Sequence, residues 1–151
     1  MQFDGDGQHD ENYIDSLVKE IDNGANFVIG SRFIEDLSEF KSSSTRRMGI
    51  KILSMLIKIC TVKKIYDPTS GFRAADKKVI RLFANHYPTE YPEPESTTEL
   101  IKRGLKVKEI PVKMHKREFG ESSIKPLKSV YYMFSVCLSI IITSISAGGR
   151  K

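Results

Sequence analysis

The stretch around which the expected fold is organised reads FDGDGQHD and covers residues 3–10. Asp4 and Asp6 stand two positions apart behind an apolar residue, so at a strand end their side chains would leave on the same side. Gly5 and Gly7 permit a sharp turn and the close approach of a large anion. Paired carboxylates are hard ligands for Mg²⁺ or Mn²⁺, which keep positions open for substrate phosphates. The stretch therefore predicts a strand end that seats a metal-bound diphosphate.

Two other interpretations of this stretch compete with a metal site. The first is an ordinary polar turn after a strand, which the bare Asp-Gly-Asp-Gly pattern favours. The second is an EF-hand loop. Counting from Asp4 places His9 where that loop needs glycine and Asp15 where it needs a bidentate glutamate, so the EF-hand is excluded. The metal prediction therefore depends on motifs further along the chain.

Composition restricts the class of protein and the kind of partner. The chain has 151 residues, of which 40% are hydrophobic and 28% charged, as in one soluble globular domain. A net charge of +5 suits an anionic partner such as a sugar nucleotide, a lipid phosphate or a membrane surface. The basic residues are dispersed and form no recognised nucleic-acid-binding module, so nucleic acid is not expected as a partner.

Hydrophobic periodicity outward from residues 3–10 predicts alternating helices and strands. Asp10 caps a helix that ends at Gly24, and residues 27–29 form a short buried strand. With residues 1–3 these elements make a βαβ unit, so we expect an α/β fold with a mostly parallel sheet flanked by helices. The further elements expected are helix 45–60, a turn and short strand at 67–73, a helix capped by Asp76, an irregular segment at 87–95, a helix from a Ser96–Glu99 capping box to about Gly104, and strand 105–112 with a bulge at Glu109.

Five motifs follow one another in a fixed order, and together they resemble family 2 glycosyltransferases. The nearest branch is similar to the dolichol-phosphate mannose synthase type and its bacterial cell-envelope relatives. The motifs are DGDGQH at 4–9, GSR at 30–32, RR at 46–47, DPTSGFR at 67–73 and RxxGxS at 117–122. The resemblance implies residues 1–128 to be the C-terminal part of a GT-A domain that lacks the N-terminal nucleotide-binding half. The unpaired sheet edge then predicts instability or a homo-oligomer.

The resemblance also implies a set of site residues and an inverting reaction with a nucleotide-diphosphate sugar donor. The implied metal ligands for Mg²⁺ or Mn²⁺ are Asp4, Asp6 and Gln8. The implied catalytic residues are Asp6 and a carboxylate that is either Glu93 or Glu95; solvated loop carboxylates are the alternative for the latter two. The implied substrate-binding residues are Arg32, Asp67, Gly71, Arg73, Arg117 and Ser122. Guanidinium groups suit bidentate contact with phosphate oxygens, and ordinary surface charges are the alternative for each arginine.

The C-terminal segment 129–151 is predicted to be an apolar helix of its own. Residues 129–149 carry no charge and as a helix would extend about 32 Å, roughly the thickness of a bilayer core. A spanning helix, a helix lying in the membrane surface and a helix packed on the domain are the alternatives. We expect membrane association, with the surface placement favoured, at the cytoplasmic inner face of the cell membrane.

The motifs thus predict a metal-dependent inverting glycosyltransferase of cell-envelope synthesis. Its acceptor would be a lipid phosphate or a glycan. The alternative is a non-catalytic remnant or subunit that needs a partner supplying the missing N-terminal half.

Overall fold

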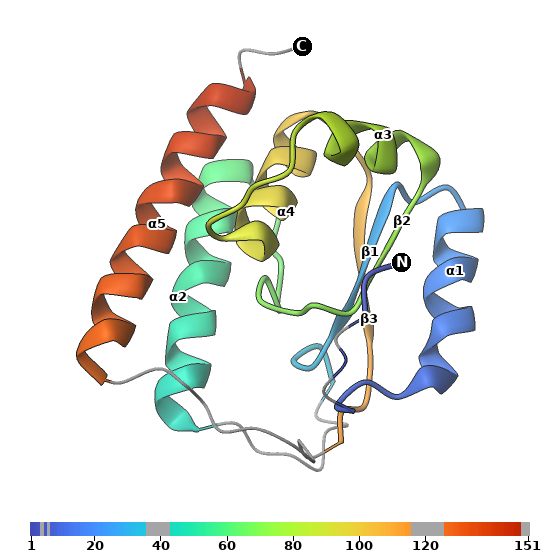
Figure 1. Ribbon diagram of the computed structural model, residues 1–151, viewed down its shortest axis with the longest axis horizontal. Helices are drawn as coiled ribbons and strands as arrows, with labels where there is room; N and C mark the ends of the chain where they lie inside the picture. Colours follow the sequence, from blue (N-terminus) through green and yellow to red (C-terminus); the bar gives the residue numbers. More distant parts are fainter. Residues whose placement is uncertain (4, 6, 36–42, 116–125, 149–151) are drawn as a thin grey trace.

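The computed structural model describes residues 1–3, 5, 7–35, 43–115 and 126–148. Helices and strands alternate along the chain, as the periodicity predicted, except that α4 follows α3 directly. The elements are a 3₁₀ turn at Glu11–Tyr13, α1 Ile14–Asp22, β1 Phe27–Ser31, α2 Ser44–Thr61, β2 Arg73–Ala75, α3 Lys77–Asn85, α4 Pro92–Lys102, β3 Val107–Pro111 and α5 Pro126–Gly148. Figure 1 shows α1 on one side of the sheet, with α2, α4 and α5 on the other.

The sheet is mixed, which corrects the expected mostly parallel sheet. Its strand order is β2-β1-β3; β1 runs parallel to β3 and antiparallel to β2. The reversal follows from the turn before β2, which passes the end of β1: Gly30 N donates to Phe72 O at 2.9 Å, and Ser70 Oγ donates to Gly30 O at 2.6 Å. Gln2 pairs antiparallel with Arg73, so residues 1–3 adjoin β2 and run parallel to β1, as predicted, but β2 lies between them and β1.

Both faces of β1 are buried, because α-helices cover the sheet on each side. Phe27 and Ile29 belong to a hydrophobic cluster with α2, α4 and α5, whereas Val28 packs with Leu17 of α1. Gly30 is needed here, because a Cβ at this position would lie 3.0 Å from the side chains of both Phe72 and Val112. The strand therefore delivers Ser31 and the residues after it at a fixed place beside the turn.

Helix α4 begins earlier than the sequence predicted. Residues 92–95 were expected to be irregular, but Pro92 starts the helix at a position where its missing N–H is not needed. Ser96 therefore lies inside the helix, where its hydroxyl donates to Pro92 O, and does not cap it. Glu99 binds Arg103 at 2.7 Å and does not complete a capping box. Both candidate catalytic glutamates consequently stand in the first helical turn.

Helix α5 packs along one side on α2 and α4, where Val136 and Ile140 are fully buried. Its other side is exposed and apolar, with Phe134 and Ile145 68% and 73% exposed. By length and composition the segment Val130–Ala147 could cross a membrane, with a mean hydropathy of 1.8 and 22% of it buried. The helix therefore joins the domain along one face and presents an apolar face outward.

Candidate functional site

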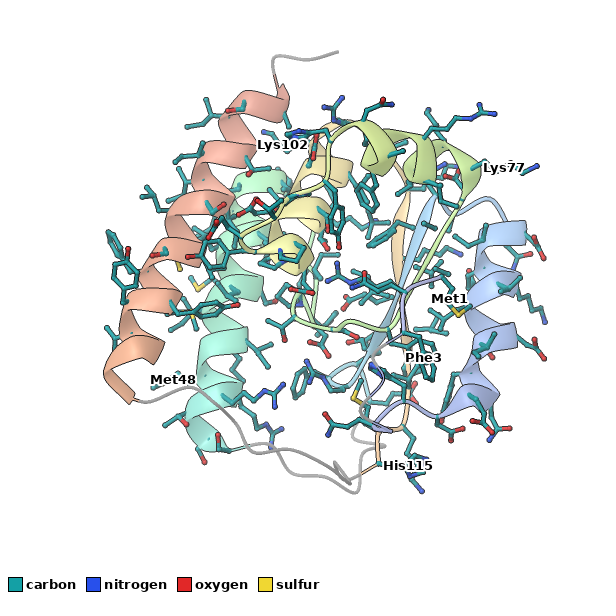
Figure 2. All side chains as sticks on the ribbon, in the orientation of Figure 1. Met1, Phe3, Met48, Lys77, Lys102 and His115 are labelled. Carbon is teal, nitrogen blue, oxygen red and sulfur yellow. The ribbon has the colours of Figure 1, made fainter. Side chains whose placement is uncertain are left out.

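An aromatic cluster supports the stretch in which the metal ligands were predicted. The ring of His9 lies 5.4 Å from that of Phe3 and 4.9 Å from that of Phe72. Figure 2 shows Phe3 and His115 toward the same end of the sheet. His9 also pairs antiparallel with Met114. The residues just before His115 therefore lie beside this stretch. Phe3 and His9, on either side of this stretch, therefore both pack against Phe72.

The predicted metal ligands are only partly within the structure. The Gln8 side chain contacts the segment that follows β3, where its Nε2 donates to His115 O at 3.4 Å. Asp4 and Asp6 lie outside the described residues, so their role as metal ligands and the role of Asp6 in catalysis stay predictions. Among the described residues, no group of three or more His, Cys, Asp or Glu side chains could hold a metal.

Arg32 and Asp67 form a buried ion pair at the end of β1. Arg32 Nε lies 2.6 Å from Asp67 Oδ2, and its Nη2 lies 2.7 Å from Asp67 Oδ1, a bidentate arrangement. The backbone N–H of Arg32 donates to the same carboxylate at 3.1 Å, and Thr69 Oγ1 accepts from Nη2 at 2.9 Å. The Asp67 side chain is fully buried and that of Arg32 is 14% exposed. Two predicted substrate-binding residues therefore meet, with Arg32 nearer the surface.

Arg73 holds the turn that carries Asp67. Its guanidinium is buried and donates to Ser70 O at 2.5 Å, to Pro68 O at 3.3 Å and to Ser96 Oγ of α4 at 3.2 Å. Gly71 is also buried within this turn. In this structure both residues shape the turn from inside. Their predicted contact with substrate stays a prediction.

Glu109 of β3 supports the same turn from the opposite side. Its carboxylate accepts from the backbone N–H of Tyr66 and of Asp67, each at 2.8 Å. Burial raises the pKa of Glu109 above its ordinary value, as does, to a smaller extent, the negative charge of Asp67. Strand β3 pairs residue for residue with β1, so the bulge expected at Glu109 is absent from it. The alternation of apolar and charged residues is interrupted at this position because the Glu109 carboxylate faces the turn.

The two candidate catalytic glutamates have different surroundings. Glu95 points to α5, where its carboxylate accepts from the Ser139 hydroxyl. Glu93 lies near Tyr132 and Tyr87; burial is the main cause that raises the pKa of both phenols, and the charge of Glu93 adds to it. The charge of Arg73 acts on Tyr87 as well, in the opposite direction. Glu93 and Arg73 thus both lie near Tyr87.

A cavity of about 720 Å³ opens between the end of β1 and α2. Cationic side chains outnumber acidic ones five to one in its wall, and apolar and aromatic groups complete it. The lining residues are Arg32, Phe33, Ile34, Glu35, Arg47, Ile50, Lys51, Ser54, Met55, Lys58, Lys64 and Tyr66. This arrangement suits an anionic group attached to an apolar body. Arg117 and Ser122, also predicted to bind substrate, lie outside the described part of the chain.

Sequence reasoning missed several members of this site. Glu109 was recognised only as an irregularity in a strand, and Lys51 and Lys58 of α2 were not assigned to the site. The spacing of Lys51 and Lys58, seven residues apart on one helical face, was the available signal. Lys64 and Tyr66 follow α2 in a short connection; Lys64 Nζ lies 4.0 Å from the centre of the Tyr66 ring, which places a cation on an aromatic face at the cavity wall.

Comparison with known proteins gives two informative similarities. The chain is 30% identical over 124 residues to a UDP-N-acetylglucosamine–dolichyl-phosphate N-acetylglucosaminyltransferase of Methanococcus voltae, covering 80% of this chain and 49% of the relative. It is 26% identical over 140 residues to a polyprenol monophosphomannose synthase of Mycolicibacterium smegmatis, covering 90% of this chain and 52% of the relative. No protein-family model matches the chain.

The chain spans about half the length of the curated relatives that it matches. The two named relatives are enzymes that attach sugars to dolichyl phosphate or polyprenol phosphate, as their names state. The α/β architecture with a small mixed sheet is compatible with part of a glycosyltransferase fold. These similarities support a relationship of the chain to family 2 glycosyltransferases, which is the family that its motifs resemble.

Proposed function

We propose that this chain carries the metal and acceptor sites of a metal-dependent, inverting glycosyltransferase. It moves a sugar from a nucleotide-diphosphate donor to a lipid-phosphate or glycan acceptor in cell-envelope synthesis. The observation that carries the proposal is the cationic and apolar cavity beside the Arg32–Asp67 pair. The similarity to two enzymes that act on polyprenyl-type phosphates supports it independently.

The cavity favours a lipid phosphate over a free glycan as the acceptor. Arg47, Lys51 and Lys58 project from the same helix that contributes Ile50 and Met55 to the wall. If the cations bind the phosphate of a lipid, the apolar chain attached to that phosphate would therefore meet an apolar surface without leaving the cavity. Arginine supplies planar paired donors for phosphate oxygens, and lysine supplies a compact positive charge.

The catalytic groups are assigned roles that this phosphate chemistry requires. Asp4, Asp6 and Gln8 would hold Mg²⁺ or Mn²⁺, which neutralises charge on the departing diphosphate. The oxygen donors of two carboxylates and one amide fit a hard divalent ion. Glu93 is the favoured general base, because Glu95 is bound to α5 through Ser139. A phosphate acceptor is already anionic and needs little deprotonation, so Glu93 matters most for a hydroxyl acceptor.

A membrane surface is proposed as the place of action, at the cytoplasmic inner face. Helices α2 and α5 pack together and both expose apolar side chains outward. On α2, Met48, Met55 and Ile59 are 62%, 65% and 67% exposed. Such a surface beside several lysines suits the interface of a bilayer with anionic lipids. An acceptor phosphate anchored in that interface would reach the cavity from the α2 side.

The test is sugar transfer measured with the whole chain. Membranes from cells that express it receive radiolabelled UDP-N-acetylglucosamine or GDP-mannose, polyprenyl phosphate and Mn²⁺, and the organic extract is counted. We expect label in the lipid fraction that disappears in excess EDTA and in Asp6→Asn. Lys77→Gln, on the distant helix α3, is the matched control and should transfer at the wild-type rate.

The alternative of a non-catalytic subunit gives a different result in the same assay. The chain would then transfer no sugar alone but would do so after co-expression with the N-terminal half of the Methanococcus voltae relative. Transfer that persists undiminished in Asp6→Asn with EDTA would contradict the proposed metal site. Absence of transfer under both conditions would contradict the proposed function.

A further inference from the structure

Glu109 is half-buried and has a bond pattern that only a carboxylate provides. Its two oxygens accept from two consecutive backbone N–H groups, those of Tyr66 and Asp67, each at 2.8 Å. The hydroxyl of Ser31, which is fully buried on β1, binds the same carboxylate. A glutamine here would offer one acceptor and one donor to two donors, and would leave one N–H unsatisfied. Glu109 therefore fixes both the position and the tilt of these two peptide groups.

The peptide groups that Glu109 binds carry two side chains of the candidate site. Asp67 aims its carboxylate at the guanidinium of Arg32, with bonds of 2.6 and 2.7 Å. Tyr66 lines the cavity, as Arg32 does. Strand β3, which is described throughout, contributes no residue to the cavity wall. Glu109 thus acts on the cavity through the turn and, by way of Ser31, through the end of β1.

We propose that Glu109 is a positioning residue that sets the Asp67 turn so that Arg32 faces the anionic group in the cavity. The inference rests on the proposed function, because it takes the ligand of Arg32 to be a phosphate. Arg73 holds the carbonyl groups of the same turn, at Pro68 and Ser70, whereas Glu109 holds its amides. The turn is fixed from both sides by charged groups, the buried Arg73 and the half-buried Glu109, and a small displacement of the turn changes the direction of the Arg32 side chain.

A half-buried carboxylate beside Asp67 opposes stability, which the raised pKa of Glu109 reflects. A residue that only stabilised the turn would show its effect in unfolding alone. A positioning residue shows it at Arg32, so the experiment measures Arg32 directly. The variants are Glu109→Gln, Arg32→Gln and the double variant. Glu99→Gln is the matched control, because it removes a buried carboxylate, on α4, away from the turn.

Two readouts are taken from each variant. The first is the ligand-free Arg32 Nε–H resonance in protein labelled with ¹⁵N-arginine, which reports the bond to Asp67. The second is the dissociation constant for farnesyl phosphate, a short probe with a phosphate and an apolar chain. We expect Glu109→Gln to shift the resonance and to weaken binding about tenfold, since a charge-assisted bond to the phosphate is misaligned. The double variant should bind no more weakly than Arg32→Gln, and Glu99→Gln should match wild type.

The outcomes separate this inference from the proposed function. An unchanged Arg32 resonance in Glu109→Gln, or additive losses in the double variant, would overturn the positioning role. A shifted resonance in a protein that does not bind farnesyl phosphate would reject the lipid-phosphate site and support the effect of Glu109 on Arg32. If Glu109→Gln does not fold, Ser31→Ala removes only one bond to the carboxylate and should produce the same two changes at smaller amplitude.

Discussion

Replacement of Asp67 by asparagine tests whether the Arg32–Asp67 pair organises the site. The Asp67 carboxylate accepts from Arg32 N at 3.1 Å, Arg32 Nε at 2.6 Å, Arg32 Nη2 at 2.7 Å and Thr69 Oγ1 at 3.2 Å. Asparagine keeps one oxygen and turns its amide nitrogen toward the guanidinium, which is itself a donor. The guanidinium of Arg32 then loses its compensating charge while it stays largely enclosed.

Removing one partner of a buried ion pair costs about 3–5 kcal/mol. Because Arg32 is 14% exposed and can gain some hydration, we expect the lower end, about 3 kcal/mol. With a urea dependence of about 2 kcal/mol per molar, the unfolding midpoint would fall by about 1.5 M. Urea unfolding followed by circular dichroism measures this.

The matched control for Asp67→Asn is Glu20→Gln, which removes the exposed pair with Lys108 and should leave the midpoint almost unchanged. A fall for Asp67→Asn no larger than that of the control would refute the reasoning. It would show that the pair is hydrated in solution and does not hold Arg32.

Three further predictions concern the backbone, the pH dependence and the exposed apolar face. Val62 ends α2 with a φ of 64°, a conformation that is strained for a residue with a Cβ. Val62→Gly should therefore raise the free energy of unfolding by roughly 1 kcal/mol, whereas Val62→Ala, which keeps the Cβ, should raise it less. A lower free energy of unfolding in Val62→Gly would show that Val62 is not strained. Glu109 has a raised pKa in the folded protein, so its contribution to stability is present below its ordinary value of 4.5 and is lost as the pH rises through the folded pKa. The unfolding free energy of Glu109→Gln should therefore rise relative to wild type as the pH increases above 4.5, and a constant difference in urea midpoints would show that burial does not govern the pKa of Glu109. Replacing both Phe134 and Ile145 by glutamate should reduce flotation with anionic liposomes at least tenfold, because each apolar side chain contributes about 1.5–3 kcal/mol on burial. The control is Ile80→Glu, at a 52% exposed position on α3. Equal flotation of wild type, the double variant and Ile80→Glu would exclude the exposed face of α5 as the membrane contact.

Local signals in the sequence located most of the elements. Helix 45–60 is confirmed as Ser44–Thr61, because an uninterrupted apolar periodicity without proline leaves few alternatives. The Asp76 cap is confirmed as well, with its carboxylate accepting from Val79 N at 2.8 Å. The start of α4 was missed because Pro92 was interpreted as a helix breaker, although proline is well suited to a first helical turn.

Long-range pairing was beyond local reasoning. The antiparallel direction of β2 depends on how Ser70 and Phe72 bind the end of β1, some 40 residues earlier in the chain. The sequence indicated the importance of the turn at 67–73, but not that Asp67 and Arg73 are buried within it. Glu109 shows the same limit, because the role of a carboxylate in a strand depends on the backbone N–H groups that it binds, and these lie far away in the sequence. Sequence patterns locate the helices and strands, whereas the contacts between these elements decide which charged groups face a ligand.

The central claim is that a lipid phosphate binds in the cavity beside Arg32 and α2. Its most direct test is photocrosslinking of the purified chain with a polyprenyl phosphate that carries a diazirine near the phosphate, followed by peptide mass spectrometry. We expect crosslinks within residues 32–35 or α2, displaced by unlabelled polyprenyl phosphate and strongly reduced in Arg32→Gln. Crosslinks concentrated on α1 or α3, or crosslinks that unlabelled polyprenyl phosphate does not displace, would contradict it.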